Sequence, residues 1–258
     1  LHSGGNPSQT KEGNAYFFRH LKDKAPNEMW NHDPTSDEDR IRVAYQHMIH
    51  KYVRCITGND DNFKRVLDYL DREKLTKDTI VIYTSDQGYW LGQHGLYDKR
   101  LLLEESVKMP LIVRYPASIK AGTVNEELVS NVDFAPTLLE FAGIKAEPRM
   151  QGRSIVPLLG GSTPADWRQA IWYAYGAAGH PHWGMRSKRY KLVLFPGTED
   201  FEFYDLQKDP REMNNVYADP AYARIRTKLK AELKRVRGEL KEEDTSAAIR
   251  EVLEKHWK

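Results

Sequence analysis

The sequence predicts an α/β fold: part of an αβα sandwich with a mostly parallel sheet, plus a small C-terminal antiparallel sheet and helix. Two apolar runs rich in β-branched residues, 79–84 and 110–114, are typical of buried parallel strands. A long stretch of helical periodicity precedes them, and a shorter helix is predicted over 133–142. This alternation of helices and strands is the pattern of a layered α/β domain.

The helical stretch is predicted to start near residue 35 and to run to about Leu75. Thr35 and Glu38 have the spacing of a capping box, with Thr35 as the N-cap. Apolar residues repeat at helical spacing on both sides of Gly58 and Asn59. Because these two residues disfavour a helix interior, they predict a break between two helices.

The sequence pattern changes after Pro157, where short strand-like runs replace the longer helical stretches. Three short strand-like runs separated by turn signals predict an antiparallel meander, and they cover residues 170–175, 183–187 and 190–195. An amphipathic helix rich in Lys, Arg and Glu is predicted from Ala221 to about Leu240. We therefore expect a boundary near residue 160. Residues 1–160 would form a portion of an α/β domain, and residues 161–258 a small α+β subdomain.

Composition excludes some classes of partner. The 258 residues include 39 basic and 37 acidic side chains, so the net charge of +2 predicts neither nucleic-acid nor anionic-membrane binding. No apolar run approaches the roughly 20 residues of a membrane-spanning helix. Cys55 is the single cysteine, so no intrachain disulfide forms. The chain starts at Leu1 rather than at Met, and we expect an N-terminal portion of the protein to be missing.

The segment from Thr84 to Lys99 carries the candidate chemistry. It begins where the predicted strand 79–84 ends, and ligands in open α/β sheets bind beyond the carboxyl ends of strands. Asp86 and Gln87 are two adjacent oxygen ligands at this position. A carboxylate plus an amide oxygen suits Ca²⁺, with Mg²⁺ as the less favoured alternative. Gly88 is expected to let the backbone turn sharply after them.

His94 and Lys99 add a titratable ring and a fixed cation to the same segment. A metal ion together with a lysine neutralises the non-bridging oxygens of a sulfate or phosphate group as its ester bond breaks. Spacing alone leaves the ordinary interpretation open. In that interpretation Asp86 caps the next turn, and His94 and Lys99 are solvated surface residues.

Several motifs occur in the order typical of one family. They are Ser85-Asp86-Gln87-Gly88, Leu91-Gly92-Gln93-His94-Gly95 with Lys99, Pro110-Leu111-Ile112, Asp133-Phe134-Ala135-Pro136-Thr137, Gln151-Gly152-Arg153-Ser154 and Phe203-Tyr204-Asp205-Leu206. Together they resemble the C-terminal part of type I, formylglycine-dependent sulfatases of the alkaline-phosphatase superfamily. The resemblance implies a sulfuric ester hydrolase that acts on a sulfated small molecule or polysaccharide. It also implies export to the periplasm or secretion for the full-length protein.

The resemblance also implies roles for individual residues. Asp86 and Gln87 match calcium ligands of the family, Lys99 matches the lysine that contacts the sulfate, and His94 matches a loop histidine assigned to catalysis and substrate. His182 lies in a segment that approaches the active-site mouth in related sulfatases, and we expect it either to bind substrate or to pack between subdomains. The nucleophilic formylglycine would lie in the missing N-terminal portion, so this chain alone is predicted to be inactive.

Two features that resemble site residues do not match the family pattern. Cys55 is followed by Ile56-Thr57-Gly58, which breaks the Cys-x-Pro/Ala-x-Arg motif that yields formylglycine. The pair Asp60-Asp61 falls in the helical stretch, where a structural role is expected. Two alternatives to a sulfatase are a phosphodiesterase or phosphonate hydrolase of the same superfamily, and a truncated, inactive remnant or binding module. The sequence leaves the oligomeric state open.

Overall fold

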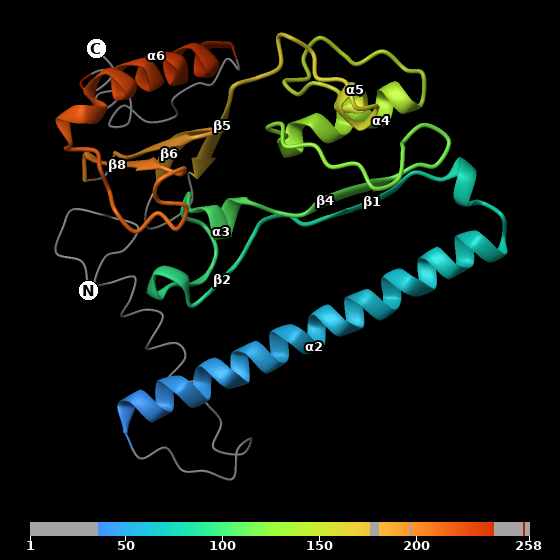
Figure 1. The fold of residues 1–258 in the computed structure, drawn as a ribbon, viewed down its shortest axis with the longest axis horizontal. Helices are drawn as coiled ribbons and strands as arrows, with labels where there is room; N and C mark the ends of the chain where they lie inside the picture. Colours follow the sequence, from blue (N-terminus) through green and yellow to red (C-terminus); the bar gives the residue numbers. More distant parts are fainter. Residues whose placement is uncertain (1–35, 176–180, 197, 240–254, 256–258) are drawn as a thin grey trace. The chain divides into compact units, whose positions relative to one another are not determined.

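The computed structural model describes residues 36–175, 181–196, 198–239 and 255, which fall into two compact units. The first unit includes the described residues up to 100 together with 105–117, and the second includes 101–104 and the described residues from 118 onward. Both units combine helices with strands, which confirms the α/β fold class (Figure 1). Residues 118–160 group with the C-terminal sheet, and the domain boundary near 160 stays a prediction.

The first unit begins with one long helix, α2 (Asp37–Arg72). Its N-cap is Ser36, whose side chain accepts a hydrogen bond from the backbone N–H of Asp39. The predicted capping box was therefore misplaced by one residue, and Thr35 lies outside the described residues. The predicted break at Gly58 was also wrong. A glycine destabilises a helix interior by only about 1 kcal/mol, and the Asn62 side chain donates back to the Gly58 carbonyl at 2.8 Å.

After η3 (Thr76–Asp78) come the two expected strands, β1 (Val81–Thr84) and β4 (Leu111–Arg114). They pair with each other antiparallel, with Val81 opposite Arg114. This pairing corrects the expectation that both runs are strands of a parallel sheet. Apolar composition identifies a strand, but it does not determine the direction of its partner. The strands are also less buried than expected, because Ile112 is 60% exposed.

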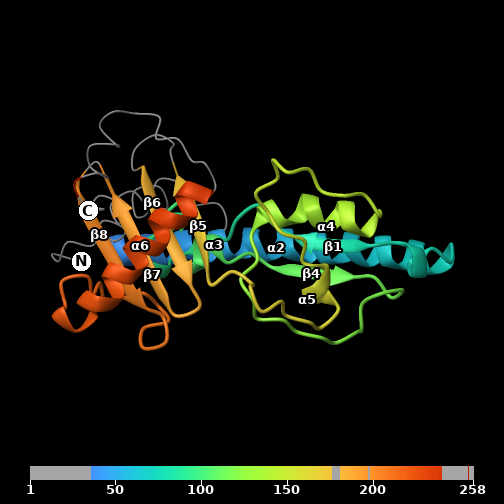
Figure 2. The same ribbon diagram turned by 90° about the horizontal axis from the view of Figure 1, so that it is seen from above.

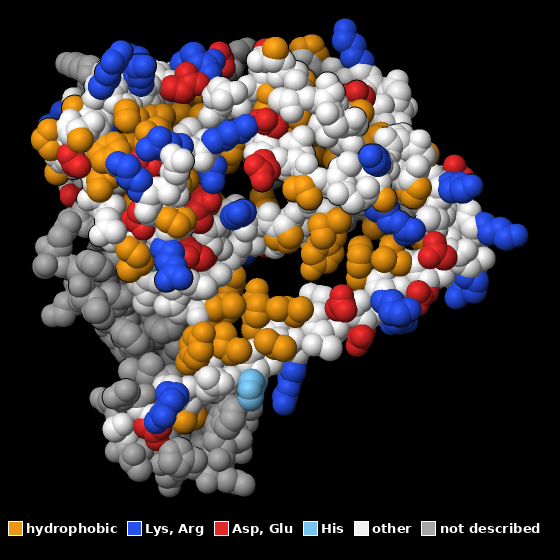
Figure 3. All heavy atoms as spheres, in the orientation of Figure 1, with side chains coloured by type: hydrophobic (Ala, Val, Ile, Leu, Met, Phe, Trp, Pro, Cys, Tyr) orange, Lys and Arg blue, Asp and Glu red, His pale blue; other side chains and the backbone are white. Residues whose placement is uncertain are grey.

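Hydrophobic side chains line an exposed side of α2 in the first unit, as Figure 3 shows. Val53, Ile56, Val66 and Tyr69 are each about half exposed. Elsewhere along the helix, aromatic contacts tie it to the rest of the unit, for example between the rings of Phe63 and Tyr83 at 5.3 Å. The helix therefore combines packed positions with apolar positions that the described residues leave about half exposed.

Four short elements follow β1 before the chain reaches β4. They are the hairpin strands β2 (Trp90–Leu91) and β3 (Tyr97–Asp98), with η4 (Gln93–Gly95) between them, and the short helix α3 (Glu104–Val107). The hairpin pairs Trp90 with Asp98 and Leu91 with Tyr97. Trp90 and Leu96 are buried, so their burial anchors the hairpin.

The second unit contains η5 (Asn131–Asp133), α4 (Phe134–Phe141) and α5 (Val156–Leu159). The helix predicted over 133–142 is confirmed. The carboxylate of Asp133 is fully buried, where it accepts hydrogen bonds from the backbone N–H groups of Ser130 and Arg153 and from the Arg168 guanidinium. A buried charge with this many donors is stabilised in place, so Asp133 joins three segments of the unit.

The C-terminal sheet has four antiparallel strands in the order β5-β6-β7-β8. They are β5 (Ala170–Tyr175), β6 (His182–Ser187), β7 (Tyr190–Phe195) and β8 (Asp200–Asp205). This confirms the predicted meander and adds β8, which the sequence analysis did not identify as a strand. After η6 (Pro220–Tyr222), the predicted helix α6 (Ala223–Glu239) crosses one face of the sheet (Figure 2).

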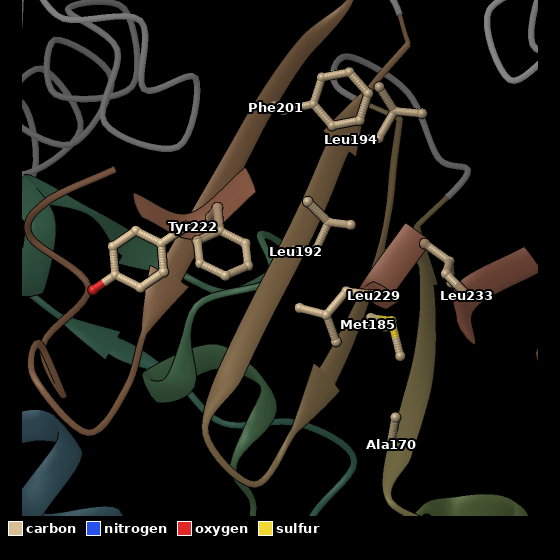
Figure 4. Close-up of a cluster of buried hydrophobic side chains, with 9 residues drawn as sticks. Ala170, Met185, Leu192, Leu194, Phe201, Tyr222, Leu229 and Leu233 are labelled. Atoms are coloured by element: carbon tan, nitrogen blue, oxygen red, sulfur yellow. The ribbon is translucent and has the colours of Figure 1, made fainter. Parts of the chain in front are cut away.

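The core of the second unit lies between this sheet and α6. The strands contribute large apolar side chains, and the helix adds Leu229 and Leu233 (Figure 4). The residues of the cluster are Ala170, Met185, Leu192, Leu194, Phe201, Phe203, Tyr222, Leu229 and Leu233. Within the part of the chain that the structure describes, no helix is long and apolar enough to cross a membrane.

Candidate active site

The β2–β3 hairpin brings the two ends of the candidate loop together. Because Trp90 pairs with Asp98, the residues just before β2 lie close to those just after β3. Asp86 precedes the hairpin and Lys99 follows it. The Lys99 ammonium donates a hydrogen bond to the Asp86 carboxylate across these 13 positions of sequence. The predicted acidic and basic site residues are thus neighbours in space.

The carboxylate of Asp86 faces solvent, with 76% of its side chain exposed. The hydrogen bond from Lys99, followed by the positive charge of that lysine, holds the pKa of Asp86 below its ordinary value. The hydroxyl of Ser85 also contacts this carboxylate, at 3.3 Å, and donates to the backbone carbonyl of Gln87 at 2.9 Å. Asp86 is therefore ionised at neutral pH and accessible to a ligand.

A hard cation is the ligand that the fold family implies at this position. Asp86 and Gln87 offer oxygen donors only, which suits Ca²⁺ better than a transition metal. Calcium takes six to eight oxygen ligands, so two residues supply only part of its shell. Among the described residues, His, Cys, Asp and Glu nowhere form a group of three or more that suits a metal ion. These residues therefore fit a partial cation site.

His94 lies inside the hairpin rather than at the surface. It adopts a left-handed backbone conformation, with φ of 57°, and only 1% of its side chain is exposed. Its Nε2 lies 3.3 Å from a carboxylate oxygen of Glu105. The ring thus connects the hairpin to the segment that begins α3. The structure brings Asp86, His94 and Lys99 into one loop region, with His94 beneath its surface.

The sequence analysis did not identify Ser106, which braces this loop region. Ser106 is fully buried, its carbonyl accepts a hydrogen bond from Gly88, and its hydroxyl accepts one from the backbone N–H of Arg100. Gly88 allows a close backbone approach, and its role in a sharp turn stays a prediction. A Cβ at this position would lie 2.0 Å from the carbonyl oxygen of Glu105, so no side chain fits there. Residues 101–107, three leucines followed by Glu-Glu-Ser-Val, gave no signal for these contacts.

His182 lies in β6 of the second unit, fully buried. Its ring centroid lies 5.7 Å from that of Tyr173, 5.3 Å from that of Tyr175 and 5.2 Å from that of Phe195. Burial, followed by the nearby Tyr175, raises the pKa of Tyr173 to about 12. This environment is that of a packed aromatic cluster within the second unit, and the expected packing between subdomains stays a prediction. A substrate contact by His182 stays a prediction.

A second cluster of charge, also missed in the sequence, lies inside the second unit. The buried Lys191 ammonium forms ion pairs with Glu104 at 2.9 Å and with Glu212 at 2.5 Å. Arg186 adds a two-armed contact to Glu104, at 3.2 and 3.0 Å. Burial opposes ionisation of Glu104, but Lys191 and Arg186 outweigh it and bring the pKa of Glu104 to about 2. Burial raises the pKa of Glu212.

Comparison with protein families identifies the family of this chain. The sulfatase model matches residues 9–144, and a model described as N-sulphoglucosamine sulphohydrolase, C-terminal, matches residues 92–239. Each match covers more than half of the chain. The chain belongs to the sulfatase family of the alkaline-phosphatase superfamily.

Individual relatives agree with this assignment. An N-acetylglucosamine-6-O-sulfatase of Bacteroides thetaiotaomicron is 42% identical over 212 residues, which is 79% of this chain and 38% of the relative. A multifunctional alkaline phosphatase superfamily protein, PehA of Trinickia caryophylli, is 33% identical over 208 residues, or 74% of this chain and 40% of the relative. The chain thus spans about two fifths of the length of these curated relatives.

A solved structure matches nearly the whole chain. It is the structure of a protein in complex with its substrate D-glucosamine-2-N,6-O-disulfate. The TM-score is 0.74 at 31% sequence identity, and the match covers 95% of this chain and 60% of the other. The likeness extends through both compact units, so the fold described above is that of the matching part of this relative.

Proposed function

We propose that this chain is part of a sulfuric ester hydrolase that acts on a sulfated carbohydrate. The observation that carries the proposal is the pairing of Asp86 with Lys99 on the loop that follows β1. This pair stands on a loop whose motifs resemble those of the family, in a chain 42% identical to an N-acetylglucosamine-6-O-sulfatase. The structural relative bound to a glucosamine disulfate supports the same substrate class, a 6-O-sulfated glucosamine unit.

The loop residues have separate roles in this proposal. Asp86 and Gln87 contribute oxygen ligands to a Ca²⁺ ion, which when bound supplies positive charge next to the sulfate group. Lys99 binds a non-bridging sulfate oxygen and stabilises the charge that develops as the ester bond breaks. For Lys99 to reach the sulfate, its ammonium has to leave or share the contact with Asp86. The proposed role of His94 is to orient the hairpin that carries Lys99.

The nucleophile is not supplied by the residues with assigned roles here. Cys55 lies exposed on α2 without the motif that would convert it to formylglycine. We therefore propose that catalysis needs a formylglycine outside this chain and that the 258 residues alone do not turn over a sulfate ester. His182 is retained as a proposed substrate contact. Its burial among aromatic rings makes it the weakest of the proposed site residues.

The experiment is a pair of substitutions in the complete reading frame that contains this sequence. The protein would be assayed with 6-O-sulfated N-acetylglucosamine and, separately, with a phosphodiester. Asp86→Asn and Lys99→Met are each expected to lower kcat by roughly 100-fold or more. The first removes a charged ligand of the proposed cation, and the second removes the ammonium that would bind the sulfate. Lys108→Met, which changes an exposed lysine near the same loop, is the matched control and should leave kcat unchanged.

The two substrates separate the proposal from its alternative. Hydrolysis of the sulfate ester, lost in both site variants, supports a sulfatase. Hydrolysis of the phosphodiester without the sulfate ester would assign the protein to the phosphodiesterase class instead. Sulfate release by the purified 258-residue chain would contradict the proposed need for an external nucleophile.

A further inference from the structure

Ser106 forms backbone contacts with both ends of the candidate loop. The Gly88 N–H donates to the Ser106 carbonyl at 2.7 Å, and the Arg100 N–H donates to the Ser106 hydroxyl at 3.0 Å. Gly88 is two residues after Asp86, and Arg100 is the residue after Lys99. A single fully buried residue therefore holds backbone positions within two residues of both members of the ion pair.

The contacts around Ser106 are close and leave little room for movement. The backbone of Gly88 lies so near to the Glu105 carbonyl that a Cβ would come within 2.0 Å of its oxygen. The Glu105 carboxylate lies 3.3 Å from Nε2 of the nearly buried His94. Residues 105 and 106 thus contact the loop at three places, one of them in the middle of the hairpin.

The backbone on both sides of Lys99 is strained, which shows that surrounding contacts determine it. Asp98 has a φ of 78° and Arg100 a φ of 132°, backbone angles that residues other than glycine rarely adopt. Such conformations persist only where neighbouring groups stabilise them, and they cluster at functional sites. The hydrogen bond from the Arg100 N–H to the Ser106 hydroxyl is one such stabilising contact.

We propose that Ser106 is a positioning residue that fixes the separation of the Asp86 and Lys99 backbones. The inference rests on the proposed function, in which this pair binds the cation and the sulfate. The ion pair does not fix its own geometry, because an exposed pair is weak and a lysine side chain is flexible. Buried hydrogen bonds from the backbone on either side supply that geometry. The serine hydroxyl is required because alanine leaves the Arg100 N–H without its acceptor.

The first test uses this chain and amide hydrogen exchange. Ser106→Ala is expected to raise the exchange rates of amides 86–88 and 97–100 by roughly threefold to tenfold, which corresponds to the loss of one hydrogen bond. Thr137→Val is the matched control. It also removes a buried hydroxyl that accepts a backbone N–H, that of Ile155 at 3.0 Å, but it does so in the second unit. It should leave amides 86–88 and 97–100 unchanged.

A second variant keeps the test informative if alanine prevents folding. Ser106→Cys preserves the size of the side chain but provides a weaker acceptor, so its exchange rates should lie between those of the unmodified chain and Ser106→Ala. Exchange that rises equally throughout the chain in both variants would overturn the proposal, as would loss of folding in both. Unchanged exchange at 86–88 and 97–100 would overturn it as well.

The second test uses the complete protein and its steady-state kinetics well below the melting temperature. Ser106→Ala is expected to lower kcat by roughly tenfold because a small misplacement of a charged group weakens transition-state stabilisation. Ser106→Cys should recover part of that loss, and Thr137→Val should lower the melting temperature without lowering kcat. Equal kcat values in Ser106→Ala and the unmodified protein would overturn the proposal. If the unmodified protein has no sulfatase activity, the proposed function fails, whereas the exchange measurements still decide the role of Ser106.

Discussion

Two groups of oppositely charged side chains in this chain differ in their access to water. Asp86 and Lys99 form a single ion pair on the loop after β1, and most of the Asp86 side chain is exposed. Lys191 and Glu212 in the second unit are fully buried, and Glu104 and Arg186 are largely so. The first pair can exchange partners with a ligand, whereas the members of the second cluster are paired with one another out of contact with water.

The difference indicates which charges serve a ligand and which serve the fold. A buried ion must be paired, because removal of one member leaves an uncompensated charge in a medium of low polarity. An exposed ion pair contributes only up to about 1 kcal/mol, so it is easily broken by a ligand that offers better contacts. Burial, rather than the residue types, separates the two roles here.

The largest effect is expected from a substitution that removes the centre of the buried cluster. Lys191→Met leaves Glu212 and Glu104 without their shared counter-charge and should lower the free energy of unfolding by about 3 kcal/mol or more. Denaturant unfolding followed by tryptophan fluorescence would measure it. The control is Lys188→Met, which removes a half-exposed lysine paired with Glu127 at 2.8 Å and should lose at most about 1 kcal/mol. Equal losses in the two variants would show that burial does not distinguish these lysines.

Acidification is expected to lower the free energy of unfolding by a slightly smaller amount. The pKa of Glu104 is about 2 in the folded chain against an ordinary value of 4.5. A depressed pKa of this kind stabilises the fold above pH ~4.5, and the contribution, about 3 kcal/mol, is lost as the pH falls toward ~2. The raised pKa of Glu212 acts in the opposite direction, because protonation of that group on acidification relieves an unfavourable buried charge.

Glu104→Gln tests this assignment. The variant should show a flatter decline of the free energy of unfolding between pH ~4.5 and ~2 than the unmodified chain. Unfolding curves taken at several pH values in that range provide the comparison. If the two chains decline in parallel, the acid sensitivity comes from other carboxylates and the buried cluster does not titrate as described.

The smallest changes in the free energy of unfolding are expected from alanine substitutions at two glycines of the first unit. Gly88→Ala places a Cβ against the Glu105 carbonyl and should lower the free energy of unfolding by about 1–3 kcal/mol. Gly58→Ala adds a Cβ in open space within α2 and should raise it by about 0.5–1 kcal/mol. Thermal unfolding of the two variants should therefore shift in opposite directions. A destabilised Gly58→Ala would indicate that α2 is broken at this position in solution.

Sequence analysis predicted best where the signal lies within one element. Periodicity located α4, α6 and the strands β5, β6 and β7, because each pattern reports which side of a single element is apolar. The same reasoning placed a false break at Gly58. The low helix propensity of one residue does not show whether the hydrogen bonds of the neighbouring helical turns continue through it. It missed β8, whose residues were noted only as part of a motif. It also predicted parallel strands for β1 and β4, which pair antiparallel.

The amino-acid sequence by itself determined the fold class and the family, and it named Asp86, Gln87, His94 and Lys99 as the candidate loop residues. Their chemical types and their order along the chain carry that information. Only the tertiary structure decided which charges are buried and which backbones touch. The sequence does not show that Lys191 and Glu212 are buried, and Ser106 meets the N–H of Gly88 only when the chain folds back after the hairpin. These properties depend on residues distant in sequence, so no local pattern predicts them.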